Sequence, residues 1–384
     1  MIENLKNRKV AILSVTNDLT ADQRVHKVAL TLIKSGFSPL LVGRKLSNSL
    51  QINERNYGTR RLNLFFTKGA LFYAEYNIRL FLFLLFQKSD LIIANDLDTL
   101  LASFIAYKIK FNLLRKNVKL VYDSHELFTE VPELNGRAFA KKSWLMIEQL
   151  ILPRIKHAYT VCYSISNEYK QKYGIEMQVV RNIPPCSGQK DKKKVPGLLS
   201  SEYAGKKIIL YQGALNIGRG VEHVIHAMEF INNAIFIIIG DGDIANQLKN
   251  IVTNKKMEEK VRFLGKIPFH SLSIYTKSAD VGIVLQEDLS LSYRYVLPNR
   301  LFDYIHAELP MIASNLPEIK KVFSENKIGL LVSDMDPENL AKKIDLLLND
   351  PKLRENYKKN LKSIKKKYCW EKEEEKLIAI FTNI

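Results

Sequence analysis

The chain has 384 residues, more than one ordinary domain holds, so two domains are the natural expectation. Hydrophobic residues make up 46% and charged residues 26%, a balance that excludes intrinsic disorder as the main state and predicts a globular protein. The formal net charge of +18 indicates an acidic partner, which would be nucleic acid, anionic lipid or a phosphorylated substrate. The sequence has no zinc-finger, heptad or RNA-binding aromatic motif, so no nucleic-acid partner is expected.

The three cysteines, Cys162, Cys186 and Cys369, are odd in number and widely spaced. This pattern argues against a disulfide framework and favours a reducing, cytoplasmic setting. The N-terminal residues contain no apolar stretch before the first predicted strand, so no signal peptide is expected. The most lipophilic run, residues 80–86, is shorter than the roughly 20 residues that cross a bilayer, so no spanning segment is expected either.

Apolar runs alternate with amphipathic segments through the first half of the chain. Residues 10–15 predict a buried strand, a helix follows a polar loop and ends at Gly36, and residues 39–42 predict a second strand. This spacing is typical of a βαβ unit with parallel strands. Further elements are a helix at residues 99–109 and strands at residues 90–94, 119–122, 159–162 and 178–185.

A polar and charged stretch at residues 187–194 predicts a surface linker, and the alternation then restarts. Strands are predicted at residues 207–211, 234–239, 261–264, 281–285, 311–313 and 329–332, and a charged helix is predicted from Trp370 onward. The fold class is therefore α/β, with two Rossmann-like, doubly wound parallel-sheet domains. In such sheets ligands bind beyond the carboxyl ends of the strands, so functional residues are expected in the loops that follow them.

The loop after the first strand has no glycine, which disfavours a dinucleotide site there. The loop after Tyr211 has glycines at the outer spacing of a P-loop, but Arg219 and Gly220 stand where that motif requires Lys and Ser or Thr. What remains is a glycine-rich turn with one guanidinium, which can grip a phosphate through two parallel hydrogen bonds. The alternative is a solvated arginine at the start of a helix.

The segment of residues 293–310 predicts a helix whose first turn holds Pro298. The backbone amides of residues 299–301 would then be unpaired donors at a positive helix end, ready for an anion, and Arg300 adds charge. Asp303, about one turn further in, can accept hydrogen bonds from a ribose diol. The alternative for Asp303 is an acid on the helix surface.

Several motifs follow one another in a characteristic order. The second half contains YQGALNIGRGVEHVIHAM, IIIGDGD, FLGKIP and LPNRLFDYIHAELPMIASNLPEI, and the first half contains TNDLTADQRVHKVA, ANDLDTLLA and YDSHELFTE. Together they resemble the retaining glycosyltransferases of family 4, which have the GT-B fold. The second-half motifs resemble the donor-binding half of the family, and the first-half motifs resemble its bacterial members. The resemblance implies an acceptor-side domain over residues 1–185, a linker over 186–206, a nucleotide-sugar-binding domain over 207–366 facing the first across a central cleft, and a terminal helix over 367–384 that crosses back to the first domain.

Carried over residue by residue, the resemblance implies a donor site in the second domain. Arg219 would contact the donor diphosphate, residues 265–267 would flank the base, and Asp303 would hold the ribose. The full donor-binding set is Gly213, Arg219, Gly265, Lys266, Ile267, Asn299, Arg300, Leu301 and Asp303.

Two positions depart from the family pattern. Tyr295 stands where the first glutamate of a pair separated by seven residues is expected, and Ala214 stands where an arginine often follows the first glycine. Glu287 could replace the missing sugar contact, or it could be a surface acid.

In the first domain, His125 resembles the family's histidine near the transferred sugar, although a lone histidine can also be structural. His125, Arg219 and Asp303 are the residues expected to carry catalysis. Asn17 and Asp18 resemble residues that line the cleft, and Glu126 is expected to orient this region. The residues expected to contact the sugar or the acceptor are Asn17, Asp18, Glu126, Glu287 and Tyr295.

Asp96 and Asp98 form the short DxD pattern that binds manganese in glycosyltransferases of the other fold. We interpret the pair as capping the helix that begins near Thr99, and no metal is expected.

The resemblance implies retaining, metal-independent transfer of a hexosyl or N-acetylhexosaminyl group from a UDP- or GDP-sugar to a glycan, without a further cofactor, in capsule or lipopolysaccharide synthesis. Apolar residues over 72–76 and 79–86 favour a lipid-linked acceptor and a peripheral position on an anionic membrane surface, at the inner face of the cytoplasmic membrane. Basic residues near them in sequence are Lys108, Lys110, Arg115, Lys116, Lys119, Lys141 and Lys142. Residues 80–86 could instead be a core helix. The competing functions are a sugar-nucleotide epimerase and a non-catalytic nucleotide-sugar-binding or scaffold protein.

Overall fold

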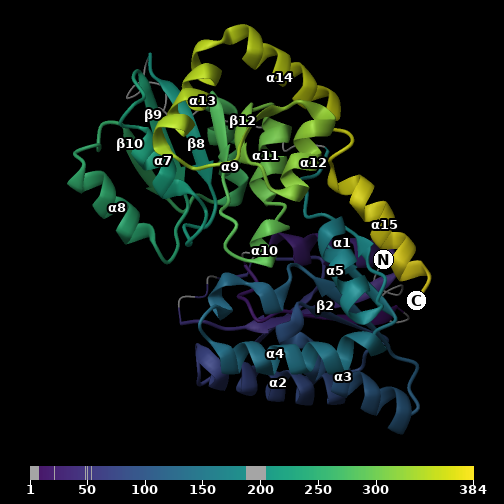
Figure 1. Ribbon diagram of the computed structural model, residues 1–384. Coiled ribbons are helices and arrows are strands. Elements are labelled where there is room, and N and C mark those ends of the chain that lie inside the picture. The colour runs from purple at the N-terminus through teal and green to yellow at the C-terminus, as the bar shows by residue number, and fades with distance from the viewer. Residues whose placement is uncertain (1–7, 21, 48, 50, 53, 187–204) are drawn as a thin grey trace. The chain divides into compact units, whose positions relative to one another are not determined.

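The computed structural model describes residues 8–186 and 205–384, apart from residues 21, 48, 50 and 53 (Figure 1). It divides into two compact units, of which the first comprises Met1–Asn182 and Glu373–Ile384 and the second Ile183–Lys372. Most of the linker expected over residues 186–206 lies outside the described residues.

The first unit is built on a sheet of seven parallel strands in the order β3-β2-β1-β4-β5-β6-β7. These are β1 (Lys9–Ser14), β2 (Phe37–Arg44), β3 (Gly58–Leu62), β4 (Leu91–Asn95), β5 (Lys119–Ser124), β6 (His157–Thr160) and β7 (Gln178–Val179). The central strands are continuous apolar runs because helices cover both faces of the sheet. Since β1, β4 and β5 are neighbours, the loops that follow them share one edge of the sheet.

Helices of the first unit form two layers. Figure 1 shows α2 (Gly69–Phe86), α3 (Leu97–Lys108) and α4 (Ala138–Ile151) grouped together, and α1 (Gln23–Lys34) and α5 (Tyr163–Tyr173) on the other side of the sheet. The helix α1 begins where the Asp22 side chain accepts a hydrogen bond from the Val25 amide at 3.1 Å.

The terminal helix α15 (Trp370–Thr382) belongs to the first unit from Glu373 onward. The Glu374 carboxylate accepts hydrogen bonds from the Thr31 hydroxyl at 2.9 Å and from Lys34 Nζ at 2.7 Å, both on α1. Leu377 and Phe381 are buried beside these contacts, so both polar and apolar interactions hold the helix end in place.

The second unit has six parallel strands in the order β10-β9-β8-β11-β12-β13. They are β8 (Lys207–Gln212), β9 (Ala234–Ile239), β10 (Val261–Gly265), β11 (Val281–Val284), β12 (Met311–Ser314) and β13 (Gly329–Val332). One core lies between the sheet and α7 (Val221–Ala227), α8 (Ala245–Asn254) and α13 (Pro337–Asn349). A second core lies under α11 (Asn299–Ala307), α12 (Pro317–Asn326) and α14 (Pro351–Ile364). Two short helices, α9 (Phe269–Ser278) and α10 (Leu291–Arg294), complete the unit.

The predicted fold class, two Rossmann-like domains with parallel sheets, is confirmed. Among the strands of the first unit, β3 and β7 differ most from the prediction, and helices α4 and α5 were not predicted. The edge strand β3 reads Gly-Thr-Arg-Arg-Leu, and its polar residues gave no strand signal because an edge strand needs little apolar surface. The strand predicted over residues 178–185 has only two residues, Gln178–Val179, and it ends well before the proline pair that was expected to stop it.

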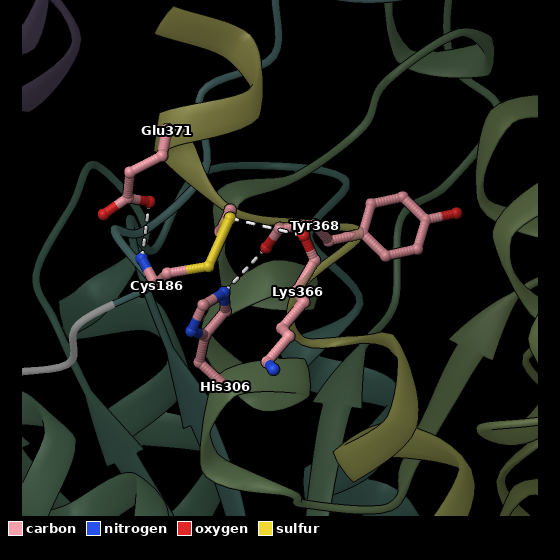
Figure 2. The surroundings of a disulfide bond; sticks show 6 residues. Cys186, His306, Lys366, Tyr368 and Glu371 are labelled. Atoms are coloured by element: carbon pink, nitrogen blue, oxygen red, sulfur yellow. Dashed lines mark hydrogen bonds between the residues drawn. A yellow bond between two sulfur atoms is a disulfide. The ribbon is translucent and has the colours of Figure 1, made fainter.

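The expectation of unpaired cysteines is wrong for two of the three. Cys186 and Cys369 form a disulfide, with their Cα atoms 5.0 Å apart (Figure 2). Cys162 is buried and is not part of this disulfide.

The expectation that no segment is long and apolar enough to cross a membrane is also wrong for the described residues. The helix α2 meets that test by length and composition alone, and 22% of its residues are buried. Its buried residues Phe72, Tyr76, Leu80 and Leu84 recur every four positions and form one stripe, while Ile78 and Phe86 are exposed.

Candidate functional site

The loops that follow β8, β9 and β10 pack backbone against backbone at their glycines. The Gly213 amide donates to the Ile239 carbonyl at 2.9 Å, and the Gly240 amide donates to the Gly265 carbonyl at 2.9 Å. Gly240 has a φ of +143°, and a β-carbon there would lie 1.8 Å from the Gly213 carbonyl oxygen. Only glycine fits, so the carboxyl edge of the sheet presents bare backbone that a ligand can approach closely.

Arg219 is held beside this backbone by a partner that sequence reasoning missed. One of its terminal nitrogens donates to the Gln286 side-chain oxygen at 2.7 Å, and its guanidinium lies 4.9 Å from the centre of the Tyr293 ring. Gln286 is 1% exposed and donates in turn to the Gly218 carbonyl at 2.9 Å. A buried glutamine directly after a predicted strand was the available signal. Because its position is fixed, the half-buried Arg219 is preorganised for an anion.

Arg300 lies beneath the glycine loop. It is 7% exposed, donates to the Leu285 carbonyl at 2.6 Å, and stacks 4.8 Å from the centre of the Tyr211 ring. A terminal nitrogen of Arg300 is 3.7 Å from the position of a β-carbon on Gly213. The guanidinium therefore supplies positive charge from below the loop while it ties α11 to the end of β11.

Asp303 is also connected to the end of a strand. Its carboxylate accepts a hydrogen bond from the Gln212 side chain at 2.9 Å, and the Thr276 hydroxyl donates to the Gln212 oxygen at 2.7 Å. This chain of hydrogen bonds fixes Asp303 relative to the last residue of β8.

The start of α11 differs from the prediction in one respect. The Leu301 amide donates to the Pro298 carbonyl at 3.0 Å, and the Leu301 side chain is fully buried. Leu301 is therefore a core residue with a paired amide, because Pro298 lies just before the helix rather than in its first turn. Asn299 is exposed at the first position of α11.

The remaining donor candidates lie around the same edge. Gly265 and Lys266 are exposed at the end of β10, and Lys266 Nζ lies 3.4 Å from an Asp241 carboxylate oxygen. Ile267 packs partly against the core of the second unit. The Glu287 amide donates to the Gly218 carbonyl at 2.9 Å, next to Arg219, and its carboxylate lies 3.4 Å from His223 Nε2.

Tyr295, which replaces the expected glutamate, is half-buried and follows α10 directly. Its amide donates to the Leu291 carbonyl at 3.2 Å and ends that helix.

In the first unit, polar residues follow three neighbouring strands. His125 comes after β5, and its Nδ1 lies 3.2 Å from Asp96, which follows β4. Its Nε2 lies 3.2 Å from Asp123, and its backbone amide donates to Asp96 at 2.7 Å. Two carboxylates therefore flank the imidazole, and 22% of its side chain is exposed.

The charges of this cluster determine the state of His125. Burial lowers the pKa of His125, but the Asp96 and Asp123 carboxylates outweigh burial and raise it to about 9. Burial raises the pKa of Asp123, but Arg24 and His125 outweigh burial and lower it to about 2. Arg24 is 3% exposed and donates to both oxygens of Asp123, at 2.6 Å and 3.1 Å. The two carboxylates therefore favour the protonated, cationic form of His125, while burial, opposed by His125, raises the pKa of Asp96 to about 7.

The capping role assigned to the DxD pair is wrong. Asp96 precedes α3, but its side chain makes no cap hydrogen bond and accepts from His125 instead. Its φ of +59° is uncommon for a residue other than glycine and turns the carboxylate toward the histidine. Asp98 is 7% exposed and accepts from the Thr16 hydroxyl. Burial, and then the neighbouring Asp96, raise the pKa of Asp98 to about 7.

Asp18 has hydrogen-bond partners that differ from those of His125. It accepts from the Thr20 amide at 3.0 Å, from Arg61 at 2.8 Å and from the Ser49 hydroxyl. Burial raises the pKa of Asp18, but these hydrogen bonds outweigh burial and lower it to about 2. The carboxylate is thus an anchor for the loop after β1.

Asn17 and Glu126 belong to the loops after β1 and β5. The Asn17 carbonyl accepts a hydrogen bond from the Arg44 amide at 3.2 Å. A β-carbon on Gly43 would lie 2.7 Å from this carbonyl oxygen, so a side chain there would clash with it. The Glu126 carbonyl accepts from the Ser124 hydroxyl at 2.8 Å. Both backbones are therefore fixed at the carboxyl edge of the sheet.

Comparison with known proteins shows what the second unit is similar to. Residues 200–364 match the family Glycosyl transferases group 1. An uncharacterized glycosyltransferase of Methanocaldococcus jannaschii is 27% identical over 172 residues, 43% of this chain and 42% of that protein. A Campylobacter jejuni protein named GalNAc-alpha-(1->4)-GalNAc-alpha-(1->3)-diNAcBac-PP-undecaprenol alpha-1,4-N-acetyl-D-galactosaminyltransferase is 26% identical over 246 residues, 62% of each chain. The chain thus matches less than two thirds of the length of either relative.

Similar solved structures extend over both units. Sucrose-phosphate synthase from Thermosynechococcus elongatus has a TM-score of 0.75 at 18% identity and covers 98% of this chain and 99% of its own. HepE of Anabaena in complex with UDP-glucose has a TM-score of 0.73 at 14% identity and covers 98% and 100%. WaaG, a glycosyltransferase involved in lipopolysaccharide biosynthesis, has a TM-score of 0.67 at 14% identity and covers 97% and 99%. The chain therefore has the GT-B fold of glycosyltransferases, and its residues 200–364 are similar to the family Glycosyl transferases group 1.

Proposed function

We propose that the protein is a retaining, metal-independent glycosyltransferase of family 4. It would transfer a hexosyl or N-acetylhexosaminyl group from a UDP- or GDP-sugar to a lipid-linked glycan, at the inner face of the cytoplasmic membrane, in bacterial surface polysaccharide synthesis. The relatives named above as glycosyltransferases, one of them acting on an undecaprenol-linked glycan, support this class of reaction.

The observation that carries the proposal is the arrangement at the carboxyl edge of the second sheet. Gly213 and Gly240 expose bare backbone there, and Arg219 and Arg300 bring two guanidinium groups to it. A donor diphosphate carries negative charge, which the two guanidinium groups can bind, and it needs backbone that it can approach closely, which the glycines provide. Asp303, held in position by its hydrogen bond from Gln212, would accept hydrogen bonds from the ribose hydroxyls.

The chemistry requires stabilisation of a leaving diphosphate and of an oxocarbenium-like transition state. Arg219 and Arg300 stabilise the leaving group by charge. A carboxylate base is not needed if the acceptor attacks on the face that the diphosphate leaves, because the diphosphate can take the acceptor's proton. His125, held as a cation by Asp96 and Asp123, then acts by hydrogen bonding and orientation rather than by abstracting a proton.

The membrane part of the proposal rests on α2. The Asn77 side chain donates to the Asp98 carbonyl at 2.8 Å and accepts from the Ala102 amide at 3.2 Å, and the Tyr76 hydroxyl donates to the Val15 carbonyl at 2.5 Å. These bonds make α2 an integral part of the first unit. Its outward residues Leu71, Ile78, Leu82 and Phe86 are between 45% and 82% exposed. Such a face suits the boundary of a bilayer rather than its interior.

One basic residue in the predicted patch is not available to lipid. Lys110 is 1% exposed and donates to the Ser89 hydroxyl at 2.8 Å and to the Gln87 carbonyl. Burial lowers the pKa of Lys110 to about 8. Lys110 therefore caps the end of α2 instead of adding to the surface charge.

A transfer assay tests the proposal. The full-length protein is incubated with labelled UDP- and GDP-sugars, with and without a bacterial lipid extract, in the presence and absence of EDTA, and the anomeric configuration of the product is read by NMR. We expect one donor to give a lipid-extractable product with retained configuration and no effect of EDTA. Donor conversion without any acceptor, or activity lost to EDTA and restored by manganese, would contradict the proposal.

A further inference from the structure

The disulfide between Cys186 and Cys369 joins the two segments at which the chain passes from one unit to the other. Cys186 is among the first residues of the second unit, which begins at Ile183, and Cys369 is among its last, which end at Lys372. The two cysteines are 183 positions apart. The bond therefore closes the second unit into one covalent ring at its entry and exit.

Hydrogen bonds place the two segments side by side independently of the sulfur atoms (Figure 2). The Trp370 amide donates to the Pro184 carbonyl at 2.8 Å, and the Cys186 amide donates to the Glu371 carboxylate at 2.7 Å. On the other side of Cys369, the Tyr368 carbonyl lies 2.7 Å from His306 Nε2 on α11. The reduced thiols would thus stay close together, which is the condition for the bond to form again.

The two sulfur atoms differ in access and in surroundings. Cys186 is exposed, whereas Cys369 is 2% exposed and its Sγ lies 3.4 Å from the Lys366 carbonyl oxygen. An outside thiolate therefore reaches Cys186, and Cys369 is the leaving group. The charged groups near the pair are Glu371 and Lys366, together with Lys365, which pairs with Glu308, and Lys367, which pairs with Glu325. Burial lowers the pKa of His306, which favours its neutral form.

We propose that Cys186 and Cys369 form a reversible thiol–disulfide exchange site that controls the freedom of the two connections between the units. In oxidation by glutathione disulfide, one cysteine thiolate displaces a glutathione thiolate and forms a mixed disulfide. The second cysteine thiolate then attacks the mixed disulfide and releases the second glutathione. The two thiols give up two electrons and two protons, which glutathione disulfide takes up as two molecules of glutathione.

The effect follows from the position of the bond. When it is closed, the entry and exit segments move as one body, and when it is open each can change its backbone angles separately. The proposed function places the protein in the cytoplasm, a reducing compartment, where disulfides are typically transient or redox-sensing rather than structural. The influence on turnover rests on the proposed glycosyl transfer, in which segment motion accompanies each cycle.

Peptide mapping and hydrogen exchange test the site on the full-length protein without an activity assay. After incubation with glutathione disulfide we expect a peptide that links Cys186 to Cys369, with Cys162 still a thiol, and its loss in dithiothreitol. Upon reduction, the amides of Cys186 and Trp370 should exchange about tenfold faster. A Cys162→Ser variant should behave as the wild type, and a Cys186→Ser, Cys369→Ser variant should exchange at the fast rate in both buffers.

Four results would overturn the proposal. Two concern the bond itself: a glutathione adduct on Cys186 beside a Cys369 thiol, or a disulfide that withstands dithiothreitol in the folded protein. The other two are amide exchange rates that do not respond to reduction, and one zinc ion bound per wild-type chain that is lost in the double variant. Turnover then separates this proposal from the proposed function. We expect the oxidised wild type to turn over at least about threefold more slowly than the reduced form, and the double variant to be equal in both buffers. Equal turnover of both wild-type forms would refute the control of activity, whereas no transfer in either form would refute the proposed function and leave the mapping and exchange results standing.

Discussion

His125 Nδ1 lies 3.2 Å from a carboxylate oxygen of Asp96, and the same aspartate accepts the histidine's backbone amide at 2.7 Å. Asp96 therefore orients both the ring and the backbone of His125. With Asp123 at the other ring nitrogen, the histidine is a positioned cation at the edge of the first sheet.

Replacing His125 should separate turnover from binding. We expect His125→Ala to lower kcat by about 10²-fold, because an oriented electrostatic contact is lost, and to change nucleotide affinity less than about twofold. Steady-state kinetics and calorimetry with the donor nucleotide measure the two effects. His157→Ala at the start of β6 is the matched control and should keep its turnover. Wild-type kcat in His125→Ala would show that the histidine is structural.

Asp98 should make the first unit less stable as the pH rises. Its pKa is raised from 3.8 to about 7, so the folded state holds the proton more tightly, and stability is lost as the pH rises through this window. His125, raised from 6.5 to about 9, adds a loss in the same direction at higher pH. Between pH 5 and pH 7 the wild type should lose about 1–3 kcal/mol of unfolding free energy that Asp98→Asn does not lose.

Urea unfolding followed by the fluorescence of Trp144, on α4 of the first unit, measures this difference. If the pH curves of wild type and Asp98→Asn run parallel, Asp98 does not titrate in this range.

Gly240→Ala should disrupt the carboxyl edge of the second sheet, where the donor is proposed to bind. A β-carbon would lie 1.8 Å from the Gly213 carbonyl oxygen at a φ of +143°, so the two loops must separate. We expect a loss of about 2–4 kcal/mol in the stability of the second unit and no measurable nucleotide binding. The control, Gly205→Ala, has a φ of +86° but open space around it, and should cost about 1 kcal/mol. Equal melting curves for both variants would contradict the close approach of the loops.

Arg219→Ala should weaken the binding of UDP or GDP by about tenfold or more, because a charge-assisted hydrogen bond to phosphate is worth about 1.5–3 kcal/mol. Gln286→Leu should have a smaller effect, since it frees Arg219 without removing its charge. Arg294→Ala is the control, because this exposed arginine is paired with Asp288. Titration calorimetry measures the affinity of each variant for UDP or GDP. Unchanged affinity in Arg219→Ala would show that Arg219 does not contact the nucleotide.

The apolar face of α2 should bind anionic lipid. We expect Ile78→Glu combined with Phe86→Glu to lower co-sedimentation with phosphatidylglycerol vesicles about tenfold, because two exposed apolar side chains become charged. Leu346→Glu, an equivalent exposed leucine on α13 of the second unit, should bind as the wild type does. If only Leu346→Glu lost vesicle binding, the lipid-binding surface would lie on the second unit, which would contradict the prediction.

The sequence predicted what depends on local pattern. Strands buried on both faces are continuous apolar runs, so β9 was predicted with the bounds that the structure has. The edge strand β13 is mostly half-buried, but its residues 330–332 are also an apolar run, and its bounds were predicted correctly as well. The polar edge strand β3 carries no such signal.

Features that depend on tertiary contacts could not be predicted in the same way. Cys186 and Cys369 are brought together by the return of the chain to its first unit, and nothing in their spacing indicates this. The turn of Asp96 toward His125 results from a positive φ that the DxD pattern does not reveal. Arg24, which neutralises Asp123, comes from a helix 99 positions away.

The central claim is that the second unit grips a nucleotide diphosphate at the carboxyl edge of its sheet, and a crystal structure with bound UDP or GDP measures this most directly. We predict phosphate oxygens within hydrogen-bonding distance of the Arg219 guanidinium and of the backbone at Gly213, with the ribose at Asp303. Nucleotide bound elsewhere, with this edge filled only by water, would contradict the account.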